Sequence, residues 1–304
     1  MLDMRRLRML HAVSAYGSVT AAASALGYSA PAVSQQLAAL EREVGLPLTE
    51  RAGRGIALTP AATLLVAHTD ALLTQLDAAE ADLATLRDQV TGRVALAAFP
   101  SAAASVVAAA WATLARSAPH VQLGLEEMEP EESLPAVLRG QADVAVAHEY
   151  DIFPRPLDPL FERRDLLTDP VLLAVPDDFP GPDDRPVRLA ELGKQSFLAP
   201  RQGTACAEMI QRACARAGFV PRVVARATDF HVLLSLVAAG AGLTLVPQLA
   251  AGPLPAGVRL LAPAEPVTRR IFTVSRRGGD RQPAVRVVLD ALLDATSTIP
   301  PRGI

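Results

Sequence analysis

The stretch Leu26-Gly27-Tyr28-Ser29-Ala30-Pro31-Ala32-Val33-Ser34-Gln35-Gln36-Leu37 decides how the first part of this 304-residue chain folds. An alanine-rich segment precedes it, and Thr20 is predicted to cap the start of that first helix. Gly27 is typical of a helix end, because the left-handed conformation costs glycine least. Ser29 is a good N-cap for a second helix, and Pro31 falls in its first turn, where a missing N–H does no harm. The pattern predicts two short helices joined by a tight turn.

The second helix has two unlike faces. Its apolar residues recur at helical spacing and predict a face packed on a core: Val33, Leu37, Leu40 and Val44. The opposite face carries Pro31, Gln35, Ala38 and Arg42, with Ser34 at its flank. Small and amide-bearing side chains suit close approach to base edges, and glutamine can make a bidentate contact to adenine.

An arginine- and glycine-rich hairpin follows, where Arg51 and Arg54 could reach phosphates or the minor groove. Two helices, a tight turn and a wing form the minimal device for laying a helix in the major groove of DNA. Residues 1–60 therefore predict a DNA-binding head. Amphipathic helix pairs are also common in other proteins, so an α/β solute-binding or catalytic protein with a dimerising N-terminus stays open.

The charge balance of the head is weak. Residues 1–60 carry six arginines against Asp3, Glu41, Glu43 and Glu50, and the whole chain has a net charge of −3. Such a head needs dimerisation as well as phosphate contacts to gain affinity for DNA. The net charge argues against a protein that coats polyanions in general.

The stretch and its surroundings resemble the winged helix-turn-helix of the LysR-type transcriptional regulators. The matching residues are Leu7, Leu10, 17–22, 26–37, Leu40, Glu41, 45–48, 50–51 and 54–61. Thr49 stands where the family usually has phenylalanine, which predicts looser packing under the wing, and Ala62 stands where it often has glycine. The resemblance implies a bacterial regulator that contacts double-stranded DNA through Ser18, Thr20, Ala30, Pro31, Ser34, Gln35, Arg51 and Arg54.

Residues 61–90 predict a long linker helix. Mostly apolar residues alternate by four and three along it, as in the seam of a coiled coil: Leu65, Thr69, Leu72, Leu76, Ala79, Leu83, Leu86 and Val90. A homodimer joined there would place two reading helices on the half-sites of a roughly palindromic target. The alternative is one long helix packed on its own domain. In the resembled family this helix dimerises and homotetramers are frequent, and RNA polymerase is a possible further partner.

Residues 91–304 alternate strands with helices and predict an α/β domain. We expect two parallel α/β lobes around a cleft, the periplasmic-binding-protein-like architecture of small-solute binders. Lobe I comprises 91–163 and 268–300, and lobe II comprises 164–267. Segments 140–143, 237–243 and 245–247 are similar to the effector domain of the same regulators. The chain as a whole is predicted to be α/β, with an all-α winged helix-turn-helix at its N-terminus.

Three predicted helix starts face this cleft, and helix N-termini favour carboxylates. In the resembled family these places line the effector site. Together with a strand-end histidine they give the candidates Ser101, Ala102, His148, Arg201, Gln202, Thr204, Asp229 and Phe230. Ser101, predicted to cap its helix, Thr204 and Asp229 could equally be plain caps, and His148 a structural histidine.

Cys206 and Cys214 fall on one predicted helix, where eight residues span about 12 Å. That separation is too long for a disulfide in an intact helix, so two small buried side chains are expected. The alternative is a thiol switch, because peroxide-sensing members of the resembled family keep a cysteine pair in this neighbourhood.

Enzyme signatures are missing from the sequence. It has no Gly-x-Ser-x-Gly elbow, no His-Glu-x-x-His and no phosphate-binding loop, and its five histidines lack metal-ligand spacing. We therefore expect no enzyme, no cofactor and no metal. The N-terminal segment is a poor secretory signal and no stretch predicts a membrane span, so a cytoplasmic protein is expected.

Overall fold

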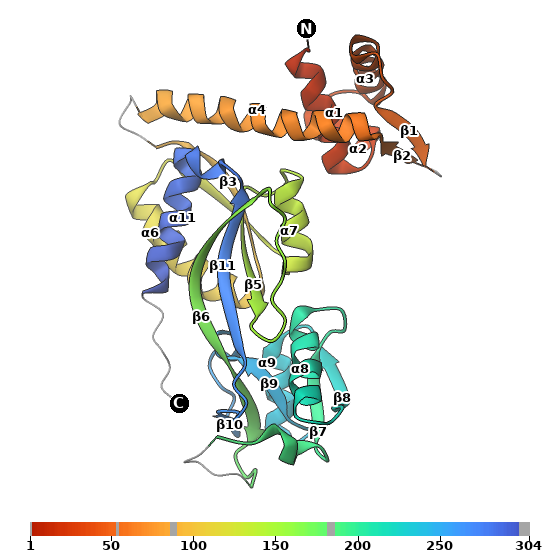
Figure 1. Ribbon diagram of the computed structural model, residues 1–304. Coiled ribbons are helices and arrows are strands. Elements are labelled where there is room, and N and C mark those ends of the chain that lie inside the picture. The colour runs from red at the N-terminus through yellow and green to blue at the C-terminus, as the bar shows by residue number, and fades with distance from the viewer. Residues whose placement is uncertain (1, 53–54, 86–89, 181–185, 298–304) are drawn as a thin grey trace.

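The computed structural model describes residues 2–52, 55–85, 90–180 and 186–297. A helical head, a long linker helix and a two-lobed domain follow one another along the chain (Figure 1). The head contains α1 (Met4–Tyr16), α2 (Val19–Leu26), α3 (Ala30–Val44) and the antiparallel hairpin of β1 (Thr49–Ala52) and β2 (Gly55–Leu58). The predicted pair of helices and its wing are therefore present.

The capping residues explain where the two helices begin. Ser18 lies in an extended conformation and its Oγ accepts a hydrogen bond from the N–H of Ala21, so Ser18 is the N-cap of α2. The prediction that Thr20 caps this helix is wrong, since Thr20 lies inside the first turn. Ser29 caps α3 as predicted, and Gly27 ends α2 with a φ of 70°.

The apolar face of α3 packs on the core of the head. Val33, Leu37 and Leu40 are at most 4% exposed and contact buried residues of α1 and α2. At the base of the wing, the backbone N–H and hydroxyl of Thr49 both donate to Oε1 of Glu41 in α3. The hydroxyl of Thr49, at the position where the resembled family usually has phenylalanine, therefore ties the wing to α3.

The predicted coiled-coil seam lies on the linker helix α4 (Pro60–Thr85), and its residues are buried near the head but exposed further along. Thr69 is fully buried and Leu65 packs partly against the head, so the first turns of α4 cover their own domain. Leu72 and Leu76 are 45% and 42% exposed. The alternative of a helix packed on its own domain thus describes the start of α4, while Leu72 and Leu76 further along remain exposed. Leu86 lies outside the described residues.

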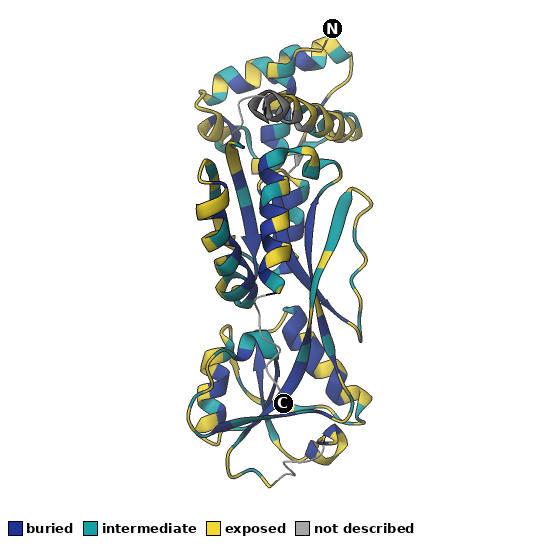
Figure 2. Ribbon diagram, turned by 90° about the vertical axis from the view of Figure 1, so that its left-hand side faces the viewer, coloured by how far each residue is buried: buried dark blue, intermediate teal, exposed yellow. Residues whose placement is uncertain are grey.

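Lobe I is built on strands β3 (Gly92–Ala98), β4 (Val121–Glu127), β5 (Val144–Tyr150) and β11 (Thr268–Arg276). Its helices are α5 (Pro100–Ala102), the π-helical turn η1 (Ala103–Val107), α6 (Ala108–Ser117), α7 (Pro130–Leu138) and α11 (Pro283–Thr296), with a short 3₁₀ turn η3 (Gly279–Arg281). The central strands β5 and β11 are buried along most of their length, whereas the edge strand β4 is not (Figure 2).

Lobe II contains β7 (Ser196–Pro200), β8 (Arg222–Ala227), β9 (Thr244–Pro247) and β10 (Val258–Leu261). Its helices are α8 (Ala205–Arg216), α9 (Phe230–Ala238), α10 (Gln248–Ala251) and the 3₁₀ turn η2 (Leu189–Leu192). The long strand β6 (Phe161–Pro176) belongs to both lobes, because it pairs with β11 at residues 161–170 and with β9 and β10 beyond them.

The prediction of two parallel lobes is wrong in part. β3 runs parallel to β4 and β5, but β6 and β11 run antiparallel to their neighbours. The chain crosses from lobe I to lobe II along the single strand β6, and the predicted boundary at residue 164 falls inside this strand. Within the described residues, every helix is too short or too polar to cross a membrane.

Candidate DNA-binding surface and effector site

The side of α3 that faces away from the core is open to solvent. Pro31, Ser34, Gln35 and Arg42 are exposed, and the Arg42 Nε donates to its own helix at the Ala38 carbonyl. Nothing in the described part of the head covers this face, so a duplex could approach it. This exposed side is the one predicted from the sequence to contact bases.

The other predicted DNA contacts have different environments. Thr20 is exposed, whereas Ser18 and Ala30 are half-buried, and the Ser18 hydroxyl is used as a cap. Arg51 lies in β1, opposite Ile56 of β2, and Arg54 lies outside the described residues.

The sequence did not predict a contact that holds α3 against α1. Arg6 of α1 donates to Gln36 at 3.1 Å and pairs with Glu43 at 3.0 Å, both on α3. Arg6 is one of three arginines at positions 5, 6 and 8, but the sequence does not show which residue each of them contacts.

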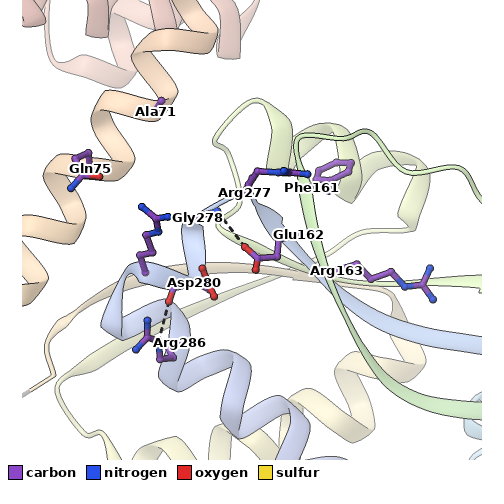
Figure 3. A pocket seen from close by; sticks show the side chains of 10 residues that line it. Ala71, Gln75, Phe161, Glu162, Arg163, Arg277, Gly278, Asp280 and Arg286 are labelled. Carbon is purple, nitrogen blue, oxygen red and sulfur yellow. Dashed lines mark hydrogen bonds between the residues drawn. The ribbon is translucent and has the colours of Figure 1, made fainter.

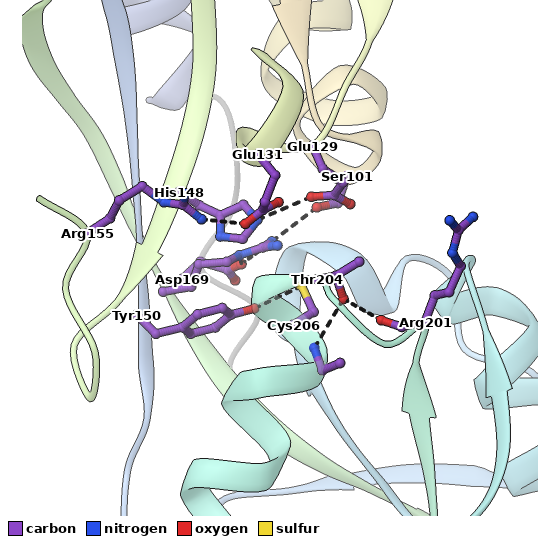
Figure 4. A network of polar contacts seen from close by, with 12 residues as sticks. Ser101, Glu129, Glu131, His148, Tyr150, Arg155, Asp169, Arg201, Thr204 and Cys206 are labelled. Carbon is purple, nitrogen blue, oxygen red and sulfur yellow. Dashed lines mark hydrogen bonds and ion pairs between the residues drawn. The ribbon is translucent and has the colours of Figure 1, made fainter. Parts of the chain in front are cut away.

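A buried ion pair lies between the lobes, in the region predicted to bind an effector (Figure 4). Nε and Nη2 of Arg269 donate to Oδ2 of Asp169 at 2.9 and 2.6 Å, and the two side chains are 2% and 3% exposed. Asp169 also accepts the N–H of Leu249 at the start of α10. The pair therefore joins β6, β11 and lobe II at the point where the strands cross between lobes.

Ser101 contacts this pair and does not cap its helix. The helix begins at Pro100, and the residue before it, Phe99, offers no side-chain cap. The prediction of a Ser101 cap is therefore wrong. Its Oγ instead accepts a hydrogen bond from Nη2 of Arg269 at 3.1 Å. Ala102 is fully buried and its N–H donates to the Phe99 carbonyl, which leaves nothing of Ala102 for a ligand.

His148 lies beside the pair with both ring nitrogens unsatisfied. It is 1% exposed, sits within β5, and packs edge-on against Phe99 and Tyr150. Glu129 is its nearest carboxylate at 3.5 Å, too long for a strong hydrogen bond, and neither nitrogen has a hydrogen-bond partner among the described residues. Burial is the main cause that lowers the pKa of His148; the nearby Glu129 carboxylate opposes this shift, and the charge of Arg269 adds to it.

The lowered pKa of His148 predicts a pH dependence of stability. A group whose pKa is lower in the folded state binds its proton more tightly when unfolded, so the free energy of unfolding should fall as the pH drops below about 6.5. Urea unfolding at a series of pH values measures this slope. His148→Phe should remove most of it, and an unchanged slope in that variant would assign the effect to other groups.

The candidate effector-binding residues of lobe II are gathered less closely around the buried ion pair than Ser101 and His148 are, and several have structural roles. Thr204 caps α8 by accepting the N–H of Ala207, and it lies with Arg201 across the network from Ser101 and Glu129 (Figure 4). Arg201 and Gln202 are exposed. Asp229 caps α9 through the N–H of His231, as the alternative predicted. Phe230 is half-buried against the lobe II core.

Both cysteines are buried and free on α8. The Tyr150 hydroxyl and the Cys206 sulfur are 3.1 Å apart. Burial raises the pKa of Cys206 to about 11 and that of Cys214 to about 12, so both are protonated at neutral pH. A protonated, buried thiol is a poor nucleophile, which argues against the thiol-switch alternative. The described residues hold no group of side chains able to ligate a metal.

Comparison with known proteins identifies both parts of the chain. The family model described as "Bacterial regulatory helix-turn-helix protein, lysR family" matches residues 4–63, and "LysR substrate binding domain" matches residues 87–297. The regulator TfdS of Cupriavidus pinatubonensis is 28% identical over 295 residues, which cover 95% of this chain and 97% of that protein.

Other relatives and a solved structure agree. OxyR of Escherichia coli, named a DNA-binding transcriptional dual regulator, is 27% identical and covers 91% of this chain and 90% of its own. A full-length OxyR variant from Pseudomonas aeruginosa has the same fold, with a TM-score of 0.73 at 19% identity, covering 96% of this chain and 95% of that chain. This chain belongs to the LysR family, whose members are DNA-binding transcriptional regulators with an effector-binding domain, not enzymes.

Proposed function

We propose that the exposed face of α3 reads the DNA target of this regulator and that a small molecule bound between the lobes controls it. One observation supports the first part above the others: α3 buries Val33, Leu37 and Leu40 while Pro31, Ser34 and Gln35 remain exposed. A helix held by one face and open on the other can enter a major groove. Thr20, Arg51 and Arg54 would contribute contacts to the DNA backbone.

Selection from a random duplex library tests the DNA-binding proposal. The full chain should enrich a sequence with two symmetry-related half-sites, because a homodimer presents two copies of α3. Its affinity should fall steeply with salt, with a slope near 0.9 per phosphate contacted. A failure to enrich any sequence over the starting library would overturn the assignment.

The linker helix supports a symmetric assembly. Leu72 and Leu76 are one turn apart on α4 and stay exposed in one chain, so a second copy of α4 could cover them. A dimer joined there, or a tetramer of such dimers, would act in the cytoplasm, where the promoter and RNA polymerase are.

The effector would bind beside the buried ion pair. Ser101 contacts the pair from lobe I, and Arg201 and Thr204 lie on the lobe II side of the network. Gln202, next to Arg201 in the chain and exposed, would contribute from the same side, and the nitrogens of the His148 ring offer hydrogen-bonding capacity. Arg201 is exposed on the lobe II side and carries a guanidinium, which favours an effector with a carboxylate or another strong acceptor. Asp229 and Phe230 would lie at the margin. A ligand that pulls the lobes together would change how the paired heads are placed.

Two substitutions test the effector site. Calorimetry of the full chain with a panel of small organic acids should identify a best ligand, and Ser101→Ala or Thr204→Val should each weaken it about fivefold, the loss of one hydrogen bond. Thr296→Val, at the exposed end of α11, is the matched control and should bind like the wild type. Full retention of binding in both site variants would move the site elsewhere.

A further inference from the structure

A cavity lies outside the region between the lobes. It has a volume of about 880 Å³ and opens between the linker helix and lobe I (Figure 3). Ala71 and Gln75, one turn apart on α4, form one wall. The start of β6, the turn after β11 and the first turns of α11 form the other walls. Neither predicted binding surface includes these residues.

The lining of this cavity has a net positive charge when the two residues that pair with groups outside it are left out of the sum. Four arginines and two carboxylates line it. Arg163 is paired with Glu149 and Asp165, away from the cavity, while Asp280 is paired with Arg164. The remaining charges are those of three arginines (Arg277, Arg281 and Arg286) and Glu162. Their sum is an excess of positive charge on a concave surface.

These three guanidinium groups keep donors to spare. Arg286 uses Nε for the Asp280 carbonyl at 3.1 Å, and Arg277 uses Nη2 for the Pro159 carbonyl at 2.9 Å. No hydrogen bond or ion pair engages the Arg281 side chain within the described residues, and that side chain is exposed. Glu162 accepts the N–H of Gly278 at 3.3 Å.

We propose that this cavity binds a small anion bearing two or more carboxylate or phosphate groups. Several guanidinium groups around one hollow suit such a ligand, because each can donate a forked pair of hydrogen bonds to a planar or tetrahedral oxyanion. A multivalent anion carries two or more charges, so its attraction to the three arginines is stronger than that of a single chloride. Gln75 adds an amide donor from the side of α4.

A ligand held there would join the linker helix to lobe I. The head already touches lobe I at a second place, where Gln141 Nε2 donates to the Ala15 carbonyl at 2.8 Å and Gly140 packs against His11. An anion between α4 and α11 would fix the angle between the linker helix and lobe I. This site would report a second signal, independent of any ligand between the lobes.

Calorimetry on the full chain tests this site, with citrate and pyrophosphate as probes and sodium chloride at matched ionic strength as the blank. At least one probe should bind, and the stronger of the two shows whether carboxylate or phosphate groups are preferred. The double variant Arg281→Gln/Arg286→Gln should weaken that probe at least tenfold. Arg216→Gln removes an equally exposed arginine from α8 and should leave binding unchanged.

A substitution on the opposite wall separates binding from loss of folding. Ala71→Met fills the hollow from α4 without changing charge and should also weaken the probe, while its thermal unfolding stays that of the wild type. Thr204→Val should have no effect, which distinguishes this site from the one between the lobes. The proposal is overturned if neither probe binds above the chloride blank, or if the arginine double variant binds like the wild type.

Discussion

Asp169→Ala is expected to lower the free energy of unfolding of the two-lobed domain by about 3–5 kcal/mol, because it leaves the buried guanidinium of Arg269 without its counterion. The same change removes the acceptor for the Leu249 N–H, which loosens α10. For a domain of this size the melting temperature should drop by on the order of 10 °C. Thermal unfolding followed by circular dichroism measures the change.

Asp165→Ala is the matched control for this variant. Asp165 lies on the same strand and also pairs with an arginine, Arg163, but its side chain is 76% exposed. An exposed pair contributes about 0–1 kcal/mol, so the control should melt close to the wild type. Asp169→Leu combined with Arg269→Met should recover much of the loss, since it removes both charges together. If Asp169→Ala melts like Asp165→Ala, the pair does not hold the lobes.

Leu72→Glu combined with Leu76→Glu is expected to separate the dimer and to weaken DNA binding by about 10²–10⁴-fold. The two leucines are 45% and 42% exposed in one chain, and four added carboxylates per dimer would repel each other across the seam. Light scattering gives the oligomeric state, and fluorescence anisotropy on a labelled duplex gives the affinity.

Leu293→Glu provides the comparison, because Leu293 is 48% exposed on α11, away from the seam. It should leave both the mass and the affinity unchanged. A Leu72→Glu/Leu76→Glu variant that stays dimeric and binds DNA normally would show that α4 does not dimerise the protein.

The sequence predicted the elements of the head better than their first residues. Thr20 was predicted to cap α2, but Ser18 is the cap. Gly17 ends α1 in the left-handed conformation, so the next residue, Ser18, takes the extended cap position. The buried face of α3 was predictable because helical periodicity alone fixes it.

The region between the lobes was less predictable. Arg269 and Asp169 stand 100 positions apart, and only the crossing of β6 and β11 brings them together. The strand that holds Arg269 also contains Arg270, Arg276 and hydroxyl residues, so the sequence did not single out Arg269 or identify its partner. The same is true of the cavity beside α4, whose walls come from three distant parts of the chain.

The open face of α3 is the basis of the proposed DNA recognition, and a base-by-base specificity profile of Gln35→Ala tests it most directly. The profile is measured with single-base variants of the selected duplex. Gln35→Ala should lose preference at one base pair in each half-site, by about 1–3 kcal/mol per site, and Gln122→Ala, an exposed glutamine on β4, should not. If Gln35→Ala keeps the wild-type profile at every position, α3 does not read DNA through the face described here.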